Sequence, residues 1–332
     1  MYRMRCFKTM TRIWFLIIAI VRNNALKLSG STQQTVLLTG STTIRASPFL
    51  KWAGGKGHLL SRLLAAVPSE AISYYEPFLG GGALFFALSS RRPNFRAFLS
   101  DTNADLVRTY NIVKNEPQEL IDHLSWYDHL YHEARDKIGF YYTMREWKPI
   151  TDVESTARFI FLNKTCYNGL YRVNKKGEFN VPFGRNKRPK IFDEGNILAV
   201  SKILAQTKAS IRALDYRKAT ENCGKGDVVY LDPPYDPTSK TSAFTDYTTS
   251  GFAKDDQEAL AEHFATLTER GCAVLLSNSD TPMVRRLYRG FRMKSFTVAR
   301  PISCIGKRRN GFRELVVFNQ PTRNRAQDAS IC

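Results

Sequence analysis

The sequence predicts an α/β protein in which one α/β domain is interrupted by a second, inserted one. Predicted strands and helices alternate on both sides of a long polar, aromatic and basic stretch, residues 125–190. Before that stretch, a strand, a glycine loop, a helix and a second strand follow one another, and such a unit implies a parallel strand pair. After it, the apolar strand Val228–Leu231 must end where two prolines follow, because proline cannot donate to a strand ladder.

Helices and strands alternate from residue 59 to the insertion. Apolar residues recur at helical spacing from Leu59 to Val67, and Pro68 ends this helix. The segment SYYEPF predicts a strand, LGGGALFFALSS predicts a glycine loop that opens into a helix, and FRAFLSD predicts a second strand that ends on Asp101. The segment NADLVRTYNIVKNEPQELIDHL is helical, and Pro117 is expected to begin a second helix.

Alternation resumes after the insertion. The segment ILAVSKILAQT predicts an amphipathic helix, and ASIRALD and DVVYLD predict strands. The segment AKDDQEALAEHFATLTERG predicts a helix that stops at Gly271. The strand CAVLLSN, the helix TPMVRRLYRG and a closing hairpin of FRMKSFTVAR and RELVVFN complete the domain.

Composition points to a polyanionic partner. The 332 residues carry a net charge of +19, which favours nucleic acid or an acidic membrane surface over a basic protein whose lysines are merely solvated. The six cysteines form no Cys-x-x-Cys pair, so we expect neither a zinc site nor disulfides but reduced thiols in a cytoplasmic protein. The five histidines lack metal-binding spacing, so no metal is expected.

Residues 1–46 read as a poorly ordered N-terminal extension. The segment is basic, without an acid, and its apolar run Trp14–Val21 has eight residues. A membrane-spanning helix needs about 20 apolar residues, and no small-residue cleavage site follows the run. We therefore expect neither a membrane anchor nor an export signal.

The glycine loop EPFLGGG, Glu76–Gly82, is the first candidate site. Glycines let a backbone approach a ligand, and the following helix offers free N–H groups. Asp101 ends the next strand, where a nucleoside-binding unit presents a carboxylate to ribose hydroxyls. The G-x-G-x-x-G phosphate spacing is absent, which favours a nucleoside without pyrophosphate. A simple turn is the alternative.

The corner LDPPYDP is the second candidate site. It follows a strand, at the edge where open α/β sheets bind ligands. Asp232 and the Pro233 carbonyl are both acceptors, and together they can hold the two hydrogens of an exocyclic amine while its lone pair faces an electrophile. Tyr235 can stack on the ring that bears this amine. The alternative is again a tight turn.

The insertion is the third candidate site. The segment from Arg158 to Lys190 contains nine Lys and Arg residues but only one acid, Glu178, and aromatic residues are interleaved with the basic ones. Basic groups bind phosphates and aromatic rings stack on bases, which favours a nucleic-acid surface over a solvated loop. The segment NKKGEF predicts a hairpin turn. Two further segments give less specific signals. The segment TSAFTDYTTSGF suits either a lid or a surface loop, and GKRRNGFRE resembles a basic hairpin tip.

Five motifs together resemble one family. In chain order they are KWAGGK, EPFLGGG, LSDTNADL, YNGLYRVNKKGEFNVPFG and LDPPYDP. From about Phe49 to Phe318 the sequence resembles the Dam-type (D12 class) adenine-N6 DNA methyltransferases, and the motif order is that of their α group. The resemblance implies a Rossmann-like, seven-stranded methyltransferase sheet with a mostly helical DNA-recognition domain inserted near residues 104–192. The catalytic domain is then residues 47–103 and 193–322, with a tail at 323–332.

The resemblance also implies partners and site residues. It implies S-adenosylmethionine as methyl donor, no metal, duplex DNA as substrate and no obligate protein partner. The catalytic positions are Asp232, Pro233 and Tyr235. The cofactor-contacting positions are Trp52, Lys56, Glu76, Phe78, Gly80, Gly82, Asp101 and Asp232. The DNA-contacting positions are Lys51, Tyr167, Asn168, Leu170, Arg172 and Pro182.

The sequence thus predicts methylation of adenine N6 in a flipped base, with GATC as the favoured target. One alternative is a methyltransferase for another amine, namely cytosine N4, RNA or a protein amide; the Asp before Pro-Pro-Tyr and the basic insertion disfavour it. The other is a non-catalytic DNA-binding relative, which the intact corner disfavours. No Pro-Cys pair occurs, so cytosine C5 chemistry is not indicated. A regulatory enzyme, a restriction–modification partner and a phage enzyme all remain open.

Overall fold

The structure is a computed structural model that describes residues 44–92, 94–186, 188–236, 252–298 and 312–319. The first 43 residues, nearly all of the segment TSAFTDYTTSGF, most of GKRRNGFRE and the tail 323–332 lie outside the described residues. In the part that is described, no helix has the length and apolar content needed to cross a membrane.

The described strands form one seven-stranded sheet, in the order β3-β2-β1-β4-β5-β7-β6. The strands are β1 (Ser73–Glu76), β2 (Arg96–Asp101), β3 (Ser210–Ala213), β4 (Val228–Leu231), β5 (Ala273–Ser279), β6 (Arg292–Val298) and β7 (Phe312–Phe318). The strands β3, β2, β1, β4 and β5 pair parallel with one another, whereas β7 pairs antiparallel with both β5 and β6. This arrangement confirms the predicted mainly parallel α/β sheet and its closing antiparallel pair.

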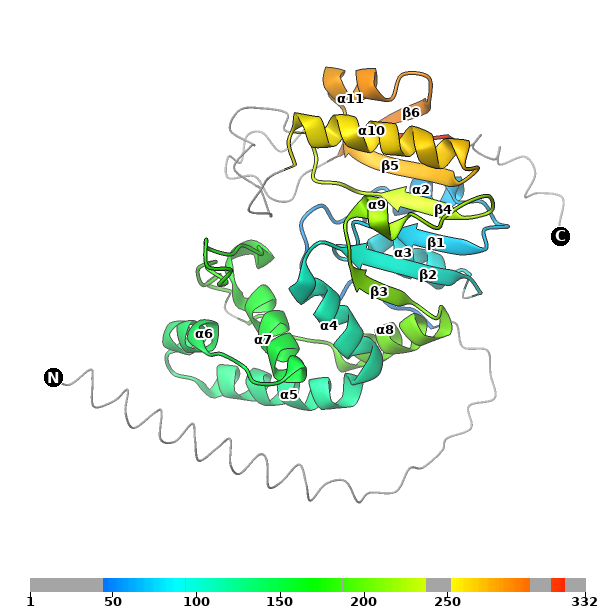
Figure 1. Ribbon diagram of the computed structural model, residues 1–332. Coiled ribbons are helices and arrows are strands. Elements are labelled where there is room, and N and C mark those ends of the chain that lie inside the picture. The colour runs from blue at the N-terminus through cyan, green and yellow to red at the C-terminus, as the bar shows by residue number, and fades with distance from the viewer. Residues whose placement is uncertain (1–43, 93, 187, 237–251, 299–311, 320–332) are drawn as a thin grey trace. The chain divides into compact units, whose positions relative to one another are not determined.

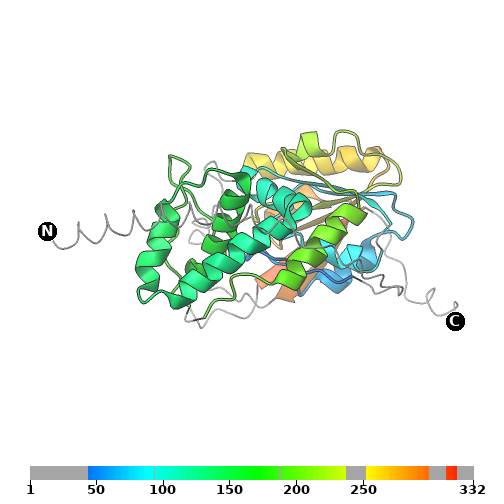
Figure 2. The ribbon, with the colours of Figure 1, turned by 90° about the horizontal axis from the view of Figure 1, so that it is seen from below.

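Helices cover both faces of the sheet. They are α2 (Leu60–Ala66), α3 (Ala83–Ser89), α4 (Ala104–Asn115), α8 (Glu194–Gln206), α9 (Tyr216–Ala219), α10 (Lys254–Glu269) and α11 (Pro282–Leu287). Figures 1 and 2 show α9 and α10 over one face and α2, α3 and α8 over the other. The core is closed by such packing: all seven residues of β5 are buried, as are Phe264 of α10 and Tyr288 after α11.

Three further helices and a short turn form the insertion. They are α5 (Pro117–Glu133), α6 (Lys137–Glu146), α7 (Asp152–Thr165) and the 3-10 turn η1 (Tyr167–Gly169). Pro117 begins α5 as predicted, while α6 and α7 carry no separate prediction. A capping box fixes the start of α7, since the Thr151 hydroxyl accepts from the Glu154 N–H and the Glu154 carboxylate accepts from the Thr151 N–H. Contacts of α4 with α7, α8 and β3 connect these helices to the sheet.

The sheet order places a ligand-binding edge between β1 and β4. These two strands are parallel neighbours, with Tyr74 opposite Val228 and Tyr75 opposite Val229. The chain leaves β1 toward β2 on one side and leaves β4 toward β5 on the other. Such a reversal opens a crevice at the carboxyl ends of the strands. The glycine loop and the Asp-Pro-Pro-Tyr corner are the segments that follow β1 and β4.

Candidate active site

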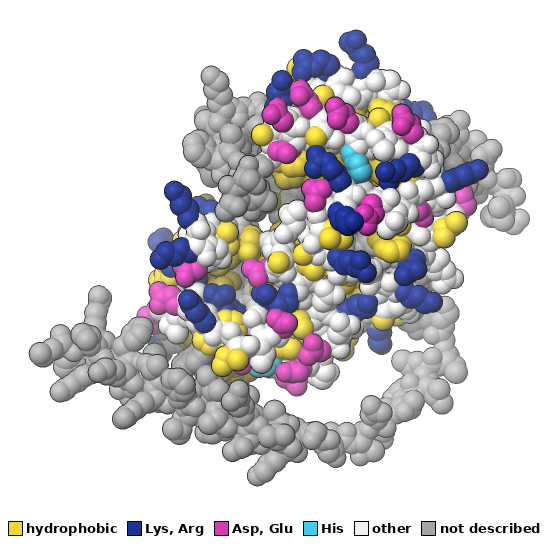
Figure 3. Space-filling model, viewed as in Figure 1, with side chains coloured by type: hydrophobic (Ala, Val, Ile, Leu, Met, Phe, Trp, Pro, Cys, Tyr) yellow, Lys and Arg dark blue, Asp and Glu magenta, His cyan; other side chains and the backbone are white. Residues whose placement is uncertain are grey.

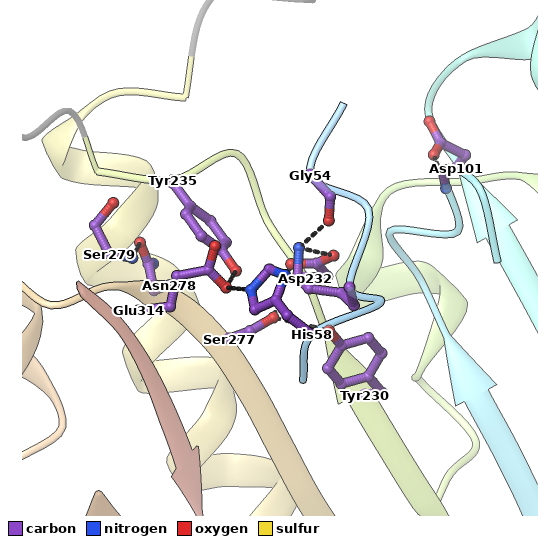
Figure 4. A network of polar contacts seen from close by, with 12 residues as sticks. Gly54, His58, Asp101, Tyr230, Asp232, Tyr235, Ser277, Asn278, Ser279 and Glu314 are labelled. Carbon is purple, nitrogen blue, oxygen red and sulfur yellow. Dashed lines mark hydrogen bonds and ion pairs between the residues drawn. The ribbon is translucent and has the colours of Figure 1, made fainter. Parts of the chain in front are cut away.

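The carboxylate of Asp232 is held from two sides. Strand β4 is buried throughout and ends at Leu231, so Asp232 is the first residue past the strand. Its Oδ2 lies 2.7 Å from Nζ of Lys56, and its Oδ1 accepts a 2.8 Å hydrogen bond from the Ser277 hydroxyl (Figure 4). An ionised carboxylate has about four acceptor positions. Two are used here, so each oxygen keeps one for a further donor.

Burial and charge set the ionisation of this pair. The Lys56 side chain is 4% exposed and that of Asp232 20% exposed. Burial raises the pKa of Asp232, and the Lys56 ammonium and the Ser277 hydroxyl counteract part of that rise. Burial acts to lower the pKa of Lys56, but the nearby Asp232, Tyr235 and Glu314 outweigh it and leave that pKa raised. The lysine is therefore charged in the folded protein.

A buried amide network fixes the chain after Asp232. The Asn278 side chain oxygen accepts from the backbone N–H of Asp236 at 3.0 Å, and its NH₂ donates to Gln257 Oε1 at 2.9 Å. Gln257 in turn donates to the Pro234 carbonyl at 3.0 Å. Both amide side chains are buried. The path of the Pro-Pro-Tyr segment is thus set by β5 and α10 as well as by proline rigidity.

The Tyr235 hydroxyl is anchored to β7. It donates to Glu314 Oε2 at 3.3 Å, and Nε2 of His58 lies 3.2 Å from the same oxygen (Figure 4). The ammonium of Lys56 lies 4.8 Å from the Tyr235 ring centroid. Burial raises the pKa of Tyr235, so the phenol stays neutral and can donate.

The glycine loop lies directly after β1. Gly80 (φ +46°) and Gly82 (φ +64°) both have left-handed backbones, which glycine adopts without steric cost. A Cβ on Gly80 would lie 2.8 Å from Trp52 Cδ1. The Gly80 N–H donates to Asp101 Oδ2 at 3.0 Å, and the Asn103 N–H donates to Asp101 Oδ1 at 3.0 Å. The loop and the end of β2 are therefore locked together.

Replacing Gly80 with alanine is expected to destabilise the fold by about 1–3 kcal/mol. The alanine would have to keep a positive φ, which strains an L-residue, and its Cβ would collide with Trp52. Gly81 is the matched control: its Cβ would meet Trp52 and Pro48 at 3.5 and 3.8 Å, which is ordinary contact. Urea denaturation of both variants measures the difference. Equal stability of the Gly80→Ala and Gly81→Ala proteins would contradict the close contact.

Glu76 is buried beneath this loop at the end of β1. The residue is 2% exposed, and its carboxylate accepts a 3.0 Å hydrogen bond from the Tyr74 hydroxyl. Burial raises the pKa of Glu76 to about 8. The ring of Phe78, two residues on, stacks on Tyr216 with centroids 5.5 Å apart.

Lys51 and the recognition segment, which we define as Tyr167–Arg172, are held together by one side chain. Asn163 on α7 accepts from the Lys51 N–H at 2.8 Å and donates to the Lys51 carbonyl at 2.7 Å. It also donates to the Gly169 carbonyl at 3.2 Å. A Cβ on Gly169 would lie 2.4 Å from Lys51 Cβ, so the two chains touch. The structure thus places Lys51 against the recognition segment, which contains four of the other predicted DNA-contacting residues, namely Tyr167, Asn168, Leu170 and Arg172.

The remaining predicted DNA contacts lie beside this segment. The Tyr167 N–H donates to the Pro182 carbonyl at 2.8 Å, and the Tyr167 side chain is 48% exposed. Asn168 has a left-handed backbone at φ 55°. Arg172 is exposed, and its Nε donates to Asn180 Oδ1 at 2.7 Å. The predicted turn is present, since the Gly177 N–H donates to the Asn174 carbonyl.

A cavity of about 360 Å³ adjoins Lys51. Its lining includes Lys51, Lys164 and Lys190. Burial, aided by the charges of Lys51 and Lys190, lowers the pKa of Lys164 to about 8. On the face shown in Figure 3, by contrast, Lys and Arg side chains are mixed with acidic ones. Asp193 also lines the cavity and pairs with Lys190 at 2.5 Å, so Lys51 and Lys164 supply its unpaired positive charge.

Sequence reasoning missed several polar residues of the site. Ser277 and Asn278 lie near the end of β5, Gln257 on α10 and Glu314 on β7, and His58 was assigned no role. A signal for two of them existed. Polar Ser and Asn close the apolar segment CAVLLSN, and a strand next to β4 ends at the same edge of the sheet.

Comparison with known proteins agrees with this geometry. Residues 52–302 match the family of D12 class N6 adenine-specific DNA methyltransferases. The chain is 44% identical over 290 residues to the type II methyltransferase M.MjaIII of Methanocaldococcus jannaschii, a match that covers 83% of this chain and 100% of that protein.

Two further relatives are similar over most of their length. The type II methyltransferase M1.LlaDCHI of Lactococcus lactis is 37% identical over 282 residues, covering 83% of this chain and 96% of the relative. The DNA adenine methylase of Vibrio cholerae is 37% identical over 283 residues, covering 82% and 96%. The chain therefore belongs to the D12 class of N6 adenine-specific DNA methyltransferases.

Proposed function

We propose that this enzyme methylates N6 of adenine within GATC in duplex DNA, with S-adenosylmethionine as methyl donor and the target base flipped out of the helix. The observation that carries the proposal is the corner after β4, where Lys56 and Ser277 hold the Asp232 carboxylate beside the glycine loop of the neighbouring strand.

The residues around the glycine loop fit the donor. Gly80 and Gly82 leave room for close approach of a ligand to the backbone, and Trp52 and Phe78 supply apolar surface. Asp101 uses one acceptor position on each oxygen for backbone N–H groups, which leaves others for ribose hydroxyls. Glu76, Lys56 and Asp232 complete the proposed set. S-adenosylmethionine, when bound, supplies a methyl group on a positively charged sulfur.

The corner prepares the amine as an acceptor of that methyl group. The Asp232 carboxylate and the Pro233 carbonyl each accept one N–H of adenine N6, so its lone pair points away from both. The ring of Tyr235, held at its hydroxyl by Glu314, stacks on the base. The raised pKa of Asp232 suits it to accept the proton that N6 loses.

Duplex DNA reaches this corner only with the base extruded. In a base pair, N6 of adenine is hydrogen-bonded inside the stack, and enzymes that act on such atoms flip the base into a pocket. We propose residues 47–103 and 193–322 as the catalytic domain and 104–192 as the recognition domain. Lys51, Tyr167, Asn168, Leu170, Arg172 and Pro182 are the proposed contacts that read the site and position the DNA.

Arg172→Ala is expected to weaken discrimination at one base pair of the target by about 1–3 kcal/mol, because an arginine can make two hydrogen bonds to a guanine edge. The measurement is kcat/KM on duplexes that each change one position of GATC. Lys176→Ala, in the neighbouring turn, is the control and is expected to weaken all duplexes alike. A uniform loss for Arg172→Ala as well would make Arg172 a phosphate contact.

Plasmid protection tests the proposed target. A plasmid that expresses the protein, in a host without N6-adenine methylation, is expected to resist an endonuclease that N6-methyladenine blocks in GATC. The Asp232→Ala protein is the control and leaves the plasmid sensitive. Full cleavage of plasmid from cells that make folded wild-type protein would exclude GATC.

A further inference from the structure

Tyr171 differs from its neighbours in the recognition segment. It lies between Leu170 and Arg172, but its ring stacks on the indole of Trp52, with centroids 5.8 Å apart and planes at 26°. The same ring also contacts Phe159 of α7, at 5.5 Å between centroids. Tyr167 and Arg172, in contrast, are exposed. The Tyr171 ring therefore packs against the protein between two residues proposed to read DNA.

The stacked indole reaches the glycine loop. The close approach of Trp52 Cδ1 to Gly80 leaves no space for a Cβ between them, and Trp52 Cβ would contact a Cβ on Gly81 at 3.5 Å. Interiors packed this closely transmit small displacements rather than absorb them. An unbroken set of contacts thus runs from the recognition segment through Tyr171 and Trp52 to the loop proposed to hold the methyl donor.

A hydrogen bond provides a second connection. The Tyr171 hydroxyl donates to Asp105 Oδ2 at 2.9 Å, and burial raises the pKa of this phenol, so it remains a donor. Asp105 lies in the first turn of α4, whose N-cap is Asn103. The Asn103 N–H donates to Asp101, the proposed ribose ligand. The contacts of Tyr171 with Trp52 and with Asp105 therefore lead to the two loops that flank the proposed donor site.

We propose that Tyr171 couples occupancy of the donor site to recognition of the DNA sequence, as a positioning residue that touches neither ligand. The inference rests on the proposed function. A ligand that fixes the glycine loop and Trp52 also fixes the surface on which Tyr171 rests, and so holds the recognition segment in its reading position. Since such coupling is reciprocal, each ligand raises the affinity for the other by the same factor, about 10-fold for a typical coupling of this kind.

Binding measurements with an unreactive ligand test the proposal. The dissociation constant of S-adenosylhomocysteine is measured by calorimetry alone and with a duplex that contains one GATC, or with a duplex of equal length that lacks it. For the wild type, we expect the GATC duplex to tighten S-adenosylhomocysteine binding about 10-fold and the other duplex to leave it unchanged. Tyr171→Leu is expected to bring that factor below about twofold, while each ligand alone binds within about threefold of wild type.

Two further variants make the result specific. Tyr171→Phe keeps the ring and removes only the donor to Asp105, so it is expected to lower the coupling factor roughly threefold; it decides the matter if Tyr171→Leu does not fold. Tyr142→Leu, on α6, is the matched control and is expected to keep full coupling. Wild-type coupling in both Tyr171 variants would overturn the inference and leave the proposed function intact. A wild-type protein that binds neither ligand would overturn the proposed function itself.

Discussion

Replacement of Asp232 by alanine is expected to lower the rate constant of methyl transfer by about 10²–10⁴-fold and to leave DNA binding largely unchanged. In the proposed mechanism, this carboxylate holds one hydrogen of the amine and receives the proton that the amine loses, so its removal takes away both contributions. Its Lys56 and Ser277 contacts fix where that carboxylate points. Single-turnover kinetics and a DNA-binding titration separate the two effects.

The control for this substitution is Asp255→Ala. Asp255 is exposed in the first turn of α10, and its loss is expected to change the rate constant by less than about twofold. Near-normal transfer by folded Asp232→Ala protein would reject the role assigned to the carboxylate.

Replacement of Lys56 by methionine is expected to change both the pH dependence of activity and the stability of the fold. Without the ammonium at 2.7 Å, burial raises the pKa of Asp232 further, and a protonated Asp232 cannot accept from the amine on that oxygen. Activity is thus expected to fall at neutral pH and to recover as pH rises, which moves the acid limb of the pH–rate profile to higher pH.

The stability of Lys56→Met is expected to fall as pH rises, whereas its activity recovers. The folded variant retains a proton on Asp232 that the unfolded chain releases near pH 4, so the free energy of unfolding declines as pH rises above that value. The loss reaches about 3 kcal/mol once the unpaired carboxylate ionises in the fold. Urea denaturation between pH 5 and 8 measures it.

Lys218→Met is the matched control for this lysine. Lys218 pairs with Glu221 on the surface, where both side chains are well exposed, and such pairs contribute about 0–1 kcal/mol. An unshifted pH–rate profile and an unchanged stability in Lys56→Met would show that the buried pair does not control Asp232.

Local signals predicted the sheet well. The two prolines after Leu231 end β4 at the predicted residue, and Gly271, at φ +81°, follows the end of α10 as predicted. These signals are short-range, since they depend on one residue's backbone limits. The start of α7 carried a local signal, the capping-box spacing of Thr151 and Glu154, but its interior gave no periodic one. In α7, residues from Phe159 to Asn163 are all buried, so the segment lacks the one-sided apolar pattern that marks a surface helix.

The site was predictable in its parts and not in its contacts. Proline and glycine patterns located the corner and the loop, and the alternation of strands and helices placed them at one edge of a sheet. The partner of Asp232 could not be predicted, because Lys56 lies far from it in the chain and only packing brings them together. The same holds for Glu314, which reaches Tyr235 from an antiparallel strand whose position depends on pairing.

The most direct test of the central claim is to locate the methyl group in the product. A duplex with one GATC is incubated with the protein and isotopically labelled S-adenosylmethionine, and its nucleosides are separated and identified by mass spectrometry. We expect labelled N6-methyladenine with the wild type, at one adenine on each strand, and none with Asp232→Ala. Label on cytosine N4, or equal labelling by both proteins, would contradict the assignment of the Asp-Pro-Pro-Tyr corner.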